Sequence, residues 1–470
     1  MSKQDQLQAY QFSAQRVTSA LVTRQTDPEQ PPFRRPGNAV FGGVAIAVVA
    51  LAAAGLYGVI NPGGNLAWQD GKSVVVEKET GTRYVYLDQR LHPVTNYASA
   101  LLAIDRHAPT LSVSRDSLAG VPRGPRIGIP DAPDALPGPD GLLTGAWTLC
   151  SQPTADQAGT VAPTSVLMAG QQALGGDPLG DRAVLADVPE TDRRYLVLRG
   201  YRHLIDKADA QAVGLALNAT PPVRVAPAVI EAIPEGAAIA PIPVADAGKP
   251  AGVVPSKPDI LAGQLFAVTT SRGVRHYLAE VGRLRPISEL QFDIQRAHQS
   301  TAAAYPGTEP SALPMGLIDA GNAPQAEVTA PKAGDPPSVR PEFARGGDGA
   351  TVCLAFDPGA VTPTVSLDPA MPHVDPLTST PRRTDGGAVL ADRVLVPSGR
   401  AVVVEAVPAA EAPAGTLLVV TDQGVAHPVA EPKTLEVLGF AGARPVRMPA
   451  GLVARIPQGS GLSHAAALKR

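Results

Sequence analysis

The sequence predicts an α+β membrane protein whose larger part is an elongated body outside the membrane. Three features carry this prediction: a long apolar segment near the N-terminus, a pattern of strands and helices that recurs four times after it, and two cysteines between the repeats. The expected architecture is an N-terminal amphipathic helix, one transmembrane helix, and an extracytoplasmic rod of four strand–helix–strand repeats around a β-rich central domain.

The apolar segment spans residues 39–60 and contains no charged residue, Asn, Gln or Pro. At roughly 1.5 Å per residue, a helix of this length covers about 33 Å, enough for a hydrocarbon core of about 30 Å. The alternatives are a buried soluble helix and a cleaved signal peptide. A signal peptide has a shorter apolar core that lies nearer the start and is followed by a small-residue cleavage site. The segment therefore predicts a retained transmembrane helix.

Basic residues precede this segment, and Lys72 is the first cation after it. The preceding ones are Lys3, Arg16, Arg24, Arg34 and Arg35. Positively charged residues favour the cytoplasmic side of a membrane. The sequence therefore predicts a cytoplasmic N-terminus and places residues 61–470 outside.

Residues 2–22 are expected to form a helix, because Ser2 and Asp5 resemble a capping box and apolar residues follow at helical spacing. The stripe consists of Leu7, Tyr10, Ala14, Val17 and Leu21. A lone helix of this size is marginally stable in water, so the stripe is predicted to rest on a partner protein; lying flat on the membrane is the alternative. Residues 25–38 are expected to form an extended linker, which completes a cytoplasmic region over residues 1–38.

The external body contains a repeat of about 45 residues. Its strands are marked by Tyr84, Tyr195, Tyr277 and Val419, and nine residues later come Pro93, Leu204, Pro286 and Pro428. The copies close at Pro122, Pro234, Pro314 and Pro457, and helical patterns lie between at 96–106, 208–217, 289–298 and 431–438. Such units bury their apolar faces against neighbouring units. Chance similarity among proline-rich segments is the alternative.

The copies fall in pairs around the cysteines, which predicts a rod with quasi-twofold internal symmetry. The expected divisions are 71–134 (repeat 1), 135–192 (central domain, first part), 193–262 (repeat 2), 263–334 (repeat 3), 335–396 (central domain, second part), 397–462 (repeat 4) and 463–470 (tail).

Cys150 and Cys353 are the only cysteines, and both lie on the predicted external side. An even number of cysteines in an oxidising compartment suggests a disulfide. Such a bridge would join the two halves into one central domain. Two buried free thiols are the alternative.

No residue is predicted to be catalytic, to hold a cofactor or to bind a metal. The segment Asp70-Gly71-Lys72-Ser73 is the nearest to a phosphate-binding loop, but that motif needs a glycine where Leu66 stands. We expect a plain turn there, before a strand at Val74–Val76, while a nucleotide site built from distant residues stays open. The net charge of −3 and the lack of a basic stripe argue against nucleic-acid binding.

Three histidines share one position in the repeat, and we expect them to brace turns. They are His92, His203 and His427, and Arg285 stands at this position in the third copy.

The order of these features resembles the EccB family, a membrane component of type VII (ESX) secretion systems. The resemblance rests on QAYQFSAQRVTSALV before the apolar segment, WQDGKSVVVEKETGTRYVYLDQRLHPVTNYASALL after it, and GPRIGIPDAPDALP at residues 124–137. It implies an inner-membrane complex with EccC, EccD and EccE, with the mycosin protease nearby. It also implies that the rod acts as a dimerising scaffold, as a homodimer or a higher oligomer.

EccB proteins are often labelled ATPases, yet this sequence has no Walker A motif. We therefore expect a structural subunit that is not an enzyme and holds no cofactor. The alternatives are ATP hydrolysis, as the label says, and cell-wall binding, since the family's repeats resemble phage-lysin wall-binding modules. That second likeness is one of fold alone.

Overall fold

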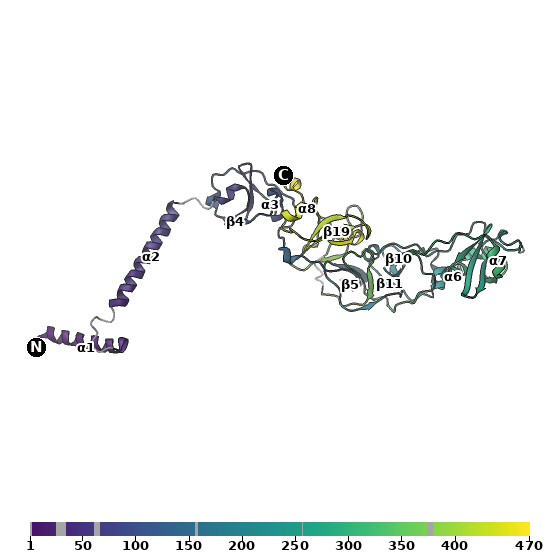
Figure 1. Ribbon diagram of the computed structural model, residues 1–470, viewed down its shortest axis with the longest axis horizontal. Coiled ribbons are helices and arrows are strands. Elements are labelled where there is room, and N and C mark those ends of the chain that lie inside the picture. The colour runs from purple at the N-terminus through teal and green to yellow at the C-terminus, as the bar shows by residue number, and fades with distance from the viewer. Residues whose placement is uncertain (1, 25–33, 61–65, 156–157, 256, 374–378) are drawn as a thin grey trace.

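The computed structural model describes residues 2–24, 34–60, 66–155, 158–255, 257–373 and 379–470. Two helices at the N-terminal end are followed by an elongated body of small sheets (Figure 1). The α+β class with one long apolar helix is confirmed.

The first helix, α1, spans Lys3–Thr23. Ser2 N donates to Asp5 Oδ2 at 2.8 Å, and Asp5 N donates to Ser2 Oγ at 3.3 Å, so the predicted capping box is present. The second helix, α2, spans Arg34–Ile60. Its segment Asn38–Tyr57 has a mean hydropathy of 2.4 and no buried side chains, so α2 is long and apolar enough to cross a membrane.

The linker prediction for residues 25–38 is wrong over its last five residues, which form the start of α2. Pro36 lies in the first turn of this helix, where its missing N–H removes no intrahelical hydrogen bond. Residues 25–33 lie outside the described part of the chain.

Each of the four repeats folds as a four-stranded sheet with the same strand order. Three antiparallel strands are followed by a helix and by a fourth strand that runs parallel to the first. Repeat 1 contains β1 (Val74–Glu77), β2 (Arg83–Leu87), β3 (Arg90–Pro93), α3 (Tyr97–Ile104) and β4 (Thr110–Val113). Repeat 2 contains β8 (Val184–Val188), β9 (Arg193–Leu198), β10 (Tyr201–Ile205), α4 (Ala210–Leu217) and β11 (Val223–Arg224).

The other two copies repeat this pattern. Repeat 3 contains β12 (Leu265–Thr270), β13 (Gly273–Glu280), β14 (Arg283–Ile287), α6 (Glu289–Ala297) and β15 (Ala312–Pro314). Repeat 4 contains β19 (Ala401–Val407), β20 (Thr416–Thr421), β21 (Ala426–Pro428), α8 (Pro432–Val437) and β22 (Val446–Pro449). The four expected helices are present, and the strand expected at Val74–Val76 is present as β1. The first strands of the other three copies were not foreseen. In repeat 2 that strand, β8, precedes the division predicted at residue 193, and the predicted divisions stay predictions.

Short helical segments connect these elements. They are η1 (Ala67–Asp70), η2 (Arg115–Leu118), η3 (Pro139–Gly141), η4 (Gln299–Ala304), α5 (Pro227–Ala232), α7 (Leu317–Asn322), α9 (Ala450–Val453) and α10 (His464–Ala467).

The nine-residue step in the sequence corresponds to the register of a hairpin. The directly paired residues are Tyr84 and Pro93 in repeat 1, Tyr195 and Leu204 in repeat 2, and Tyr277 and Pro286 in repeat 3. In repeat 4, Pro428 pairs with Leu418, so Val419 is not the equivalent residue. The turn after β20 has one more residue than the turns of repeats 1 and 2, which shifts the register by one.

The closing proline of each copy holds the third strand. The carbonyls of Pro122, Pro234 and Pro457 accept hydrogen bonds from Leu91 N, Arg202 N and Ala426 N. In repeat 3 the acceptor is Pro324, which binds Leu284 N at 2.7 Å. The assignment of Pro314 to this role is wrong, because Pro314 ends β15 instead. The 3-10 helix η4, before β15, helps to lengthen the connection in this copy.

The central sheet takes three strands from each half of the body. Its order is β18-β6-β5-β16-β17-β7. The strands are β5 (Trp147–Ala155), β6 (Val161–Met168), β7 (Asp177–Pro178), β16 (Val352–Phe356), β17 (Thr364–Leu367) and β18 (Arg393–Leu395). The antiparallel strands β5 and β16 are adjacent, with Cys150 directly opposite Cys353. The order reads the same from either edge once the halves are exchanged, and a quasi-twofold axis passes between these cysteines. The edge strands depart from this symmetry, because β18 is parallel to β6 whereas β7 is antiparallel to β17.

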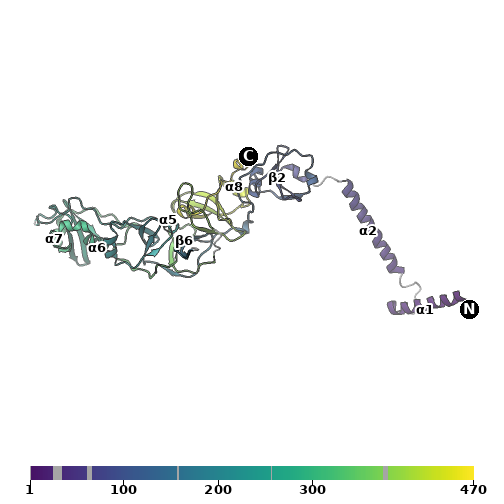
Figure 2. The same cartoon turned by 180° about the vertical axis from the view of Figure 1, so that it is seen from behind.

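Shared hydrophobic cores place the units in the order repeat 1, repeat 4, central sheet, repeat 2, repeat 3. One core joins repeats 1 and 4, a second joins the central sheet to repeats 2 and 4, and a third joins repeat 2 to α6 of repeat 3. Both views show this line of units, with α7 at the end far from α2 (Figures 1 and 2). The C-terminus returns to repeat 1, where Gly128 N donates to Lys469 O at 3.1 Å.

Candidate functional site

The disulfide between Cys150 and Cys353 is formed, with the two Cα atoms 4.0 Å apart. Both cysteines are buried, and apolar side chains that include Val166 and Met168 surround them. The pairing prediction is confirmed, and the alternative of two free thiols is wrong. The bridge closes a loop of 203 residues and links the two halves at their symmetry axis.

The predicted partner-binding stripe lies on α1, and all five of its side chains are exposed. They are Leu7, Tyr10, Ala14, Val17 and Leu21. At 100° per residue these positions share one face of the helix. The geometry is that of an uncovered apolar face, and its role in binding a partner stays a prediction.

The three repeat histidines brace turns, as predicted. In each, Nδ1 lies within hydrogen-bond distance of a backbone carbonyl: His92 with Pro125 O at 3.1 Å, His203 with Ala237 O at 2.8 Å, and His427 with Ser460 O at 3.2 Å. Each ring also lies against a glycine of the closing turn, Gly124, Gly236 or Gly459, and leaves no room for a Cβ atom. Burial lowers the pKa of His203 below its ordinary value, and the hydrogen bond to Ala237 opposes this shift only in part.

The segment Asp70–Ser73 forms the turn expected from its sequence. Lys72 N donates to Asp70 Oδ1 at 2.8 Å, and Gly71 adopts a φ of 69°. The Lys72 side chain is exposed. Within the described residues, no three His, Cys, Asp or Glu side chains gather in a way that could hold a metal ion.

Cavities occur at one equivalent place in three repeats, which sequence reasoning did not reveal. Their volumes are about 320 Å³ in repeat 2, about 390 Å³ in repeat 3 and about 690 Å³ in repeat 4. Each lies where the second strand begins beside the start of the repeat helix. The shared position of these two elements is not a sufficient signal, because repeat 1 has both elements and its own chain fills this place.

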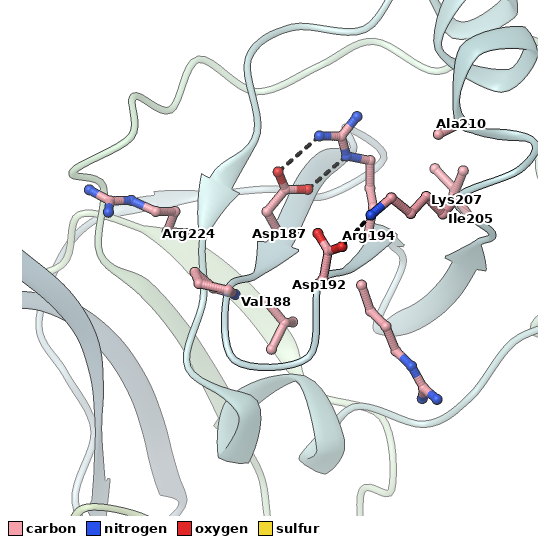
Figure 3. A pocket seen from close by; sticks show the side chains of 10 residues that line it. Asp187, Val188, Asp192, Arg194, Ile205, Lys207, Ala210 and Arg224 are labelled. Atoms are coloured by element: carbon pink, nitrogen blue, oxygen red, sulfur yellow. Dashed lines mark hydrogen bonds and ion pairs between the residues drawn. The ribbon is translucent and has the colours of Figure 1, made fainter.

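The cavity of repeat 2 is lined by charged side chains (Figure 3). Arg194 donates from Nε and Nη2 to the two oxygens of Asp187, at 2.7 and 2.9 Å. Lys207 Nζ donates to Asp192 Oδ2 at 2.5 Å. The hydrogen bond from Lys207 lowers the pKa of Asp192, and the bond to Asp187 raises the pKa of Arg194.

The whole chain, residues 1–470, matches the family model described as "Type VII secretion system ESX-1, transport TM domain B". The chain belongs to the EccB family. Among curated relatives, the ESX-1 secretion system ATPase EccB1 of Mycobacterium tuberculosis is 30% identical over 316 residues, which cover 66% of this chain and 62% of the relative. The match therefore spans less than two thirds of that relative's length. The ESX-3 secretion system ATPase EccB3 of Mycolicibacterium smegmatis is 27% identical over 483 residues, which cover 98% of this chain and 89% of the relative.

Solved structures share the EccB fold of this chain. A chain of the intact ESX-5 inner membrane complex covers all of it, with a TM-score of 0.61 and 24% identity over 95% of that chain. The structure of the EccB3 dimer from the ESX-3 core complex covers 85% of it, with a TM-score of 0.59 and 24% identity over all of that chain.

Proposed function

We propose that this EccB protein is a single-pass structural subunit of a type VII secretion complex in a bacterial inner membrane. In this proposal, its external rod acts as a dimerising scaffold. The observation that carries the proposal is the continuous packing along the rod. Shared cores join all five units of the rod, the disulfide crosses its centre, and the C-terminal helix α10 packs on α3 of the first repeat. A body packed in this way can keep the proteins bound along it at fixed distances from one another.

The proposed orientation places α1 in the cytoplasm and the rod outside, in accord with the basic residues that precede α2. Single-cysteine labelling tests it in intact cells, because the native cysteines are paired. A membrane-impermeant maleimide should react with Thr80→Cys and spare Gln4→Cys. Labelling of Gln4→Cys alone would reverse the proposed orientation.

The proposed neighbours are EccC, EccD, EccE and the mycosin protease, with a second copy of this chain as the dimer partner. This proposal is supported by family membership and by the fold shared with chains from an inner membrane complex and from an EccB dimer. The exposed stripe on α1 is the proposed docking face for a cytoplasmic partner.

The docking face can be tested by exchanging Leu7, Val17 and Leu21 for Ser in the full chain and purifying the complex from membranes. We expect the variant chain to insert normally and to recover at least about fivefold less of one partner, because three apolar side chains that the partner would cover are lost. The control exchanges Gln8 and Gln15, on the other side of the helix, for Ser. Identical complexes from both variants would refute partner binding by this face.

ATP hydrolysis is the second candidate function, since the relatives carry the name ATPase. The full chain in detergent is assayed for ATP turnover beside Lys72→Ala. Turnover that this substitution abolishes would overturn the structural proposal. Capture of the chain by peptidoglycan would favour wall binding instead.

A further inference from the structure

In repeat 1, the chain itself occupies the place where the other repeats have a cavity. After the closing turn, residues 129–134 fold back across the start of α3. Asp134 Oδ1 accepts from Arg83 Nη1 at 2.9 Å and from Tyr97 N at 3.1 Å. Ala98 N donates to Pro133 O at 3.1 Å. Repeat 1 thus holds a carboxylate on an extended, proline-flanked segment.

The register of the hairpins identifies the same place in repeat 2. Arg83 precedes Tyr84 in the first hairpin, and Arg194 precedes Tyr195 in the second. Tyr97 begins α3, and Ala210 begins α4. Arg194 and Ala210 both line the 320 Å³ cavity.

The segment that fills this place in repeat 1 follows a different path in repeat 2. Ile127 N donates to Pro93 O, and Ile239 N donates to Leu204 O, so the two chains correspond at these residues. Beyond Ile239 the chain crosses to repeat 3. There Ile242 N donates to Gln295 Oε1 at 2.7 Å, and Gln295 Nε2 donates to Ile242 O at 3.1 Å. The cavity of repeat 2 therefore stays open because its own segment joins the next repeat.

The lining of this cavity retains the arginine that repeat 1 uses, whereas Ala210 N already donates to Lys207 O at 3.4 Å. Four cations, Arg193, Arg194, Lys207 and Arg224, and two carboxylates, Asp187 and Asp192, line the cavity. Arg224 pairs with Asp348, outside this lining, at 2.7 Å. Arg194 uses Nε and Nη2 toward Asp187, and a guanidinium has five donors. Within the described residues, Arg193 forms no ion pair. The cavity has donors for a further carboxylate.

The cavities of repeats 3 and 4 lack the arginine that lines the cavity of repeat 2. The residue equivalent to Arg83 is His276 in repeat 3 and Leu417 in repeat 4. The first helical residue is Glu289 in repeat 3 and Pro432 in repeat 4, and Pro432 has no N–H to donate. Among the three cavities, that of repeat 2 suits an anionic ligand best.

We propose that the cavity of repeat 2 binds an acidic side chain on an extended, proline-flanked peptide of a partner protein. The carboxylate lies between Arg194 and Lys207, as Asp134 lies beside Arg83 in repeat 1. Arg193, at the rim, draws the peptide in by its charge. This site is separate from the α1 stripe, so a substitution can abolish binding at one of them and leave binding at the other unchanged.

The probe is a fluorescent peptide with the sequence of residues 129–136, IPDAPDAL, titrated with the full chain in detergent. We expect saturable binding that weakens at least about fivefold when the Asp equivalent to Asp134 is replaced by Asn in the peptide, because the charge-assisted bonds are lost. Binding should also weaken at least about fivefold in the double variant Arg193→Ser, Lys207→Gln, and when salt screens these exposed charges.

The matched control is Arg199→Gln, which removes an exposed cation of the same repeat that pairs with Asp181 away from the cavity. It should bind the peptide like the unchanged chain. Equal binding of the Asp and Asn peptides would overturn the proposal, and so would unchanged binding in a folded double variant. Thermal unfolding of each variant separates loss of the site from loss of the fold.

Discussion

Two helices at equivalent positions, α5 in repeat 2 and α7 in repeat 3, have different surroundings. In α5 every residue except Glu231 is buried, and the helix packs on β5 of the central sheet and on α9 of repeat 4. In α7, Leu317 and Ile318 are 62% and 78% exposed. The repeat therefore folds whether or not this helix is covered. Whether this helix is buried depends on where its repeat lies along the rod. The inner repeats, 2 and 4, share their core with the central sheet.

The largest expected effect comes from a charge placed in the inner helix. Val229 is fully buried in the core that joins repeats 2 and 4 to the central sheet. Val229→Asp should lower the free energy of unfolding by about 3–5 kcal/mol, because an uncompensated charge would lie in an apolar core. Chemical denaturation of the full chain in detergent measures this change.

The outer helix provides the control for this charge. Ile318→Asp, on the exposed face of α7 and one position before the residue that corresponds to Val229, should change stability by no more than about 0.5 kcal/mol. If both variants lost the same free energy of unfolding, burial of α5 and exposure of α7 would not explain how the inner and outer repeats differ.

The next effect concerns the bond at the symmetry axis. Exchanging both Cys150 and Cys353 for Ser should lower the unfolding free energy by about 2–4 kcal/mol, since the bridge closes a loop of 203 residues in the unfolded chain. The melting temperature of the purified protein should fall accordingly, while membrane insertion is unchanged. A melting curve that neither the substitutions nor a reductant shifts would contradict a stabilising bridge.

A smaller effect distinguishes the three histidine-braced repeats from repeat 3. A Cβ atom on Gly459 would lie 2.3 Å from Cε1 of His427, whose side chain is fully buried. Gly459→Ala should therefore cost about 1–3 kcal/mol through overpacking. Repeat 3 already has Ala326 at this position, opposite Arg285, and Ala326→Gly should change stability by less than about 1 kcal/mol.

A double-mutant cycle identifies the cause of this cost. In a His427→Ala background the ring is absent, so Gly459→Ala should become markedly less costly. If the cost stayed the same in both backgrounds, the ring would not be what excludes a side chain at this glycine.

Much of the fold follows from local patterns in the sequence. The apolar run of α2, the cap at Ser2 and the nine-residue hairpin step all depend on residues close together in the chain. The first strands of repeats 2, 3 and 4 were missed because each pairs on both sides and resembles any short apolar run. Pro314 was misassigned because the connection in repeat 3 is longer than in the other copies.

The cavities could not be predicted because they depend on where a segment goes after its repeat ends. Residues 129–134 and their counterparts after repeat 2 are both proline-rich, yet the first fold back and the second cross to repeat 3. Only tertiary packing separates these outcomes. Likewise, the sequence of α7 does not indicate that Leu317 stays exposed within the described part of the chain.

The smallest expected effect is a pH dependence that originates in an inner repeat. Burial holds the pKa of His203 below its ordinary value of 6.5, so the unfolded chain takes up this proton more readily than the folded one. Stability from this residue is thus complete above about pH 6.5 and declines as pH falls toward the lower folded pKa. His203→Asn, which keeps a donor for Ala237 O, should reduce the loss of stability between pH 7.5 and 5.5 by up to about 1 kcal/mol in denaturation experiments. Val213→Ala, in the same repeat core, is the matched control: it lowers stability at both pH values and retains the slope, and an equal change of slope in both variants would exclude His203 as its source.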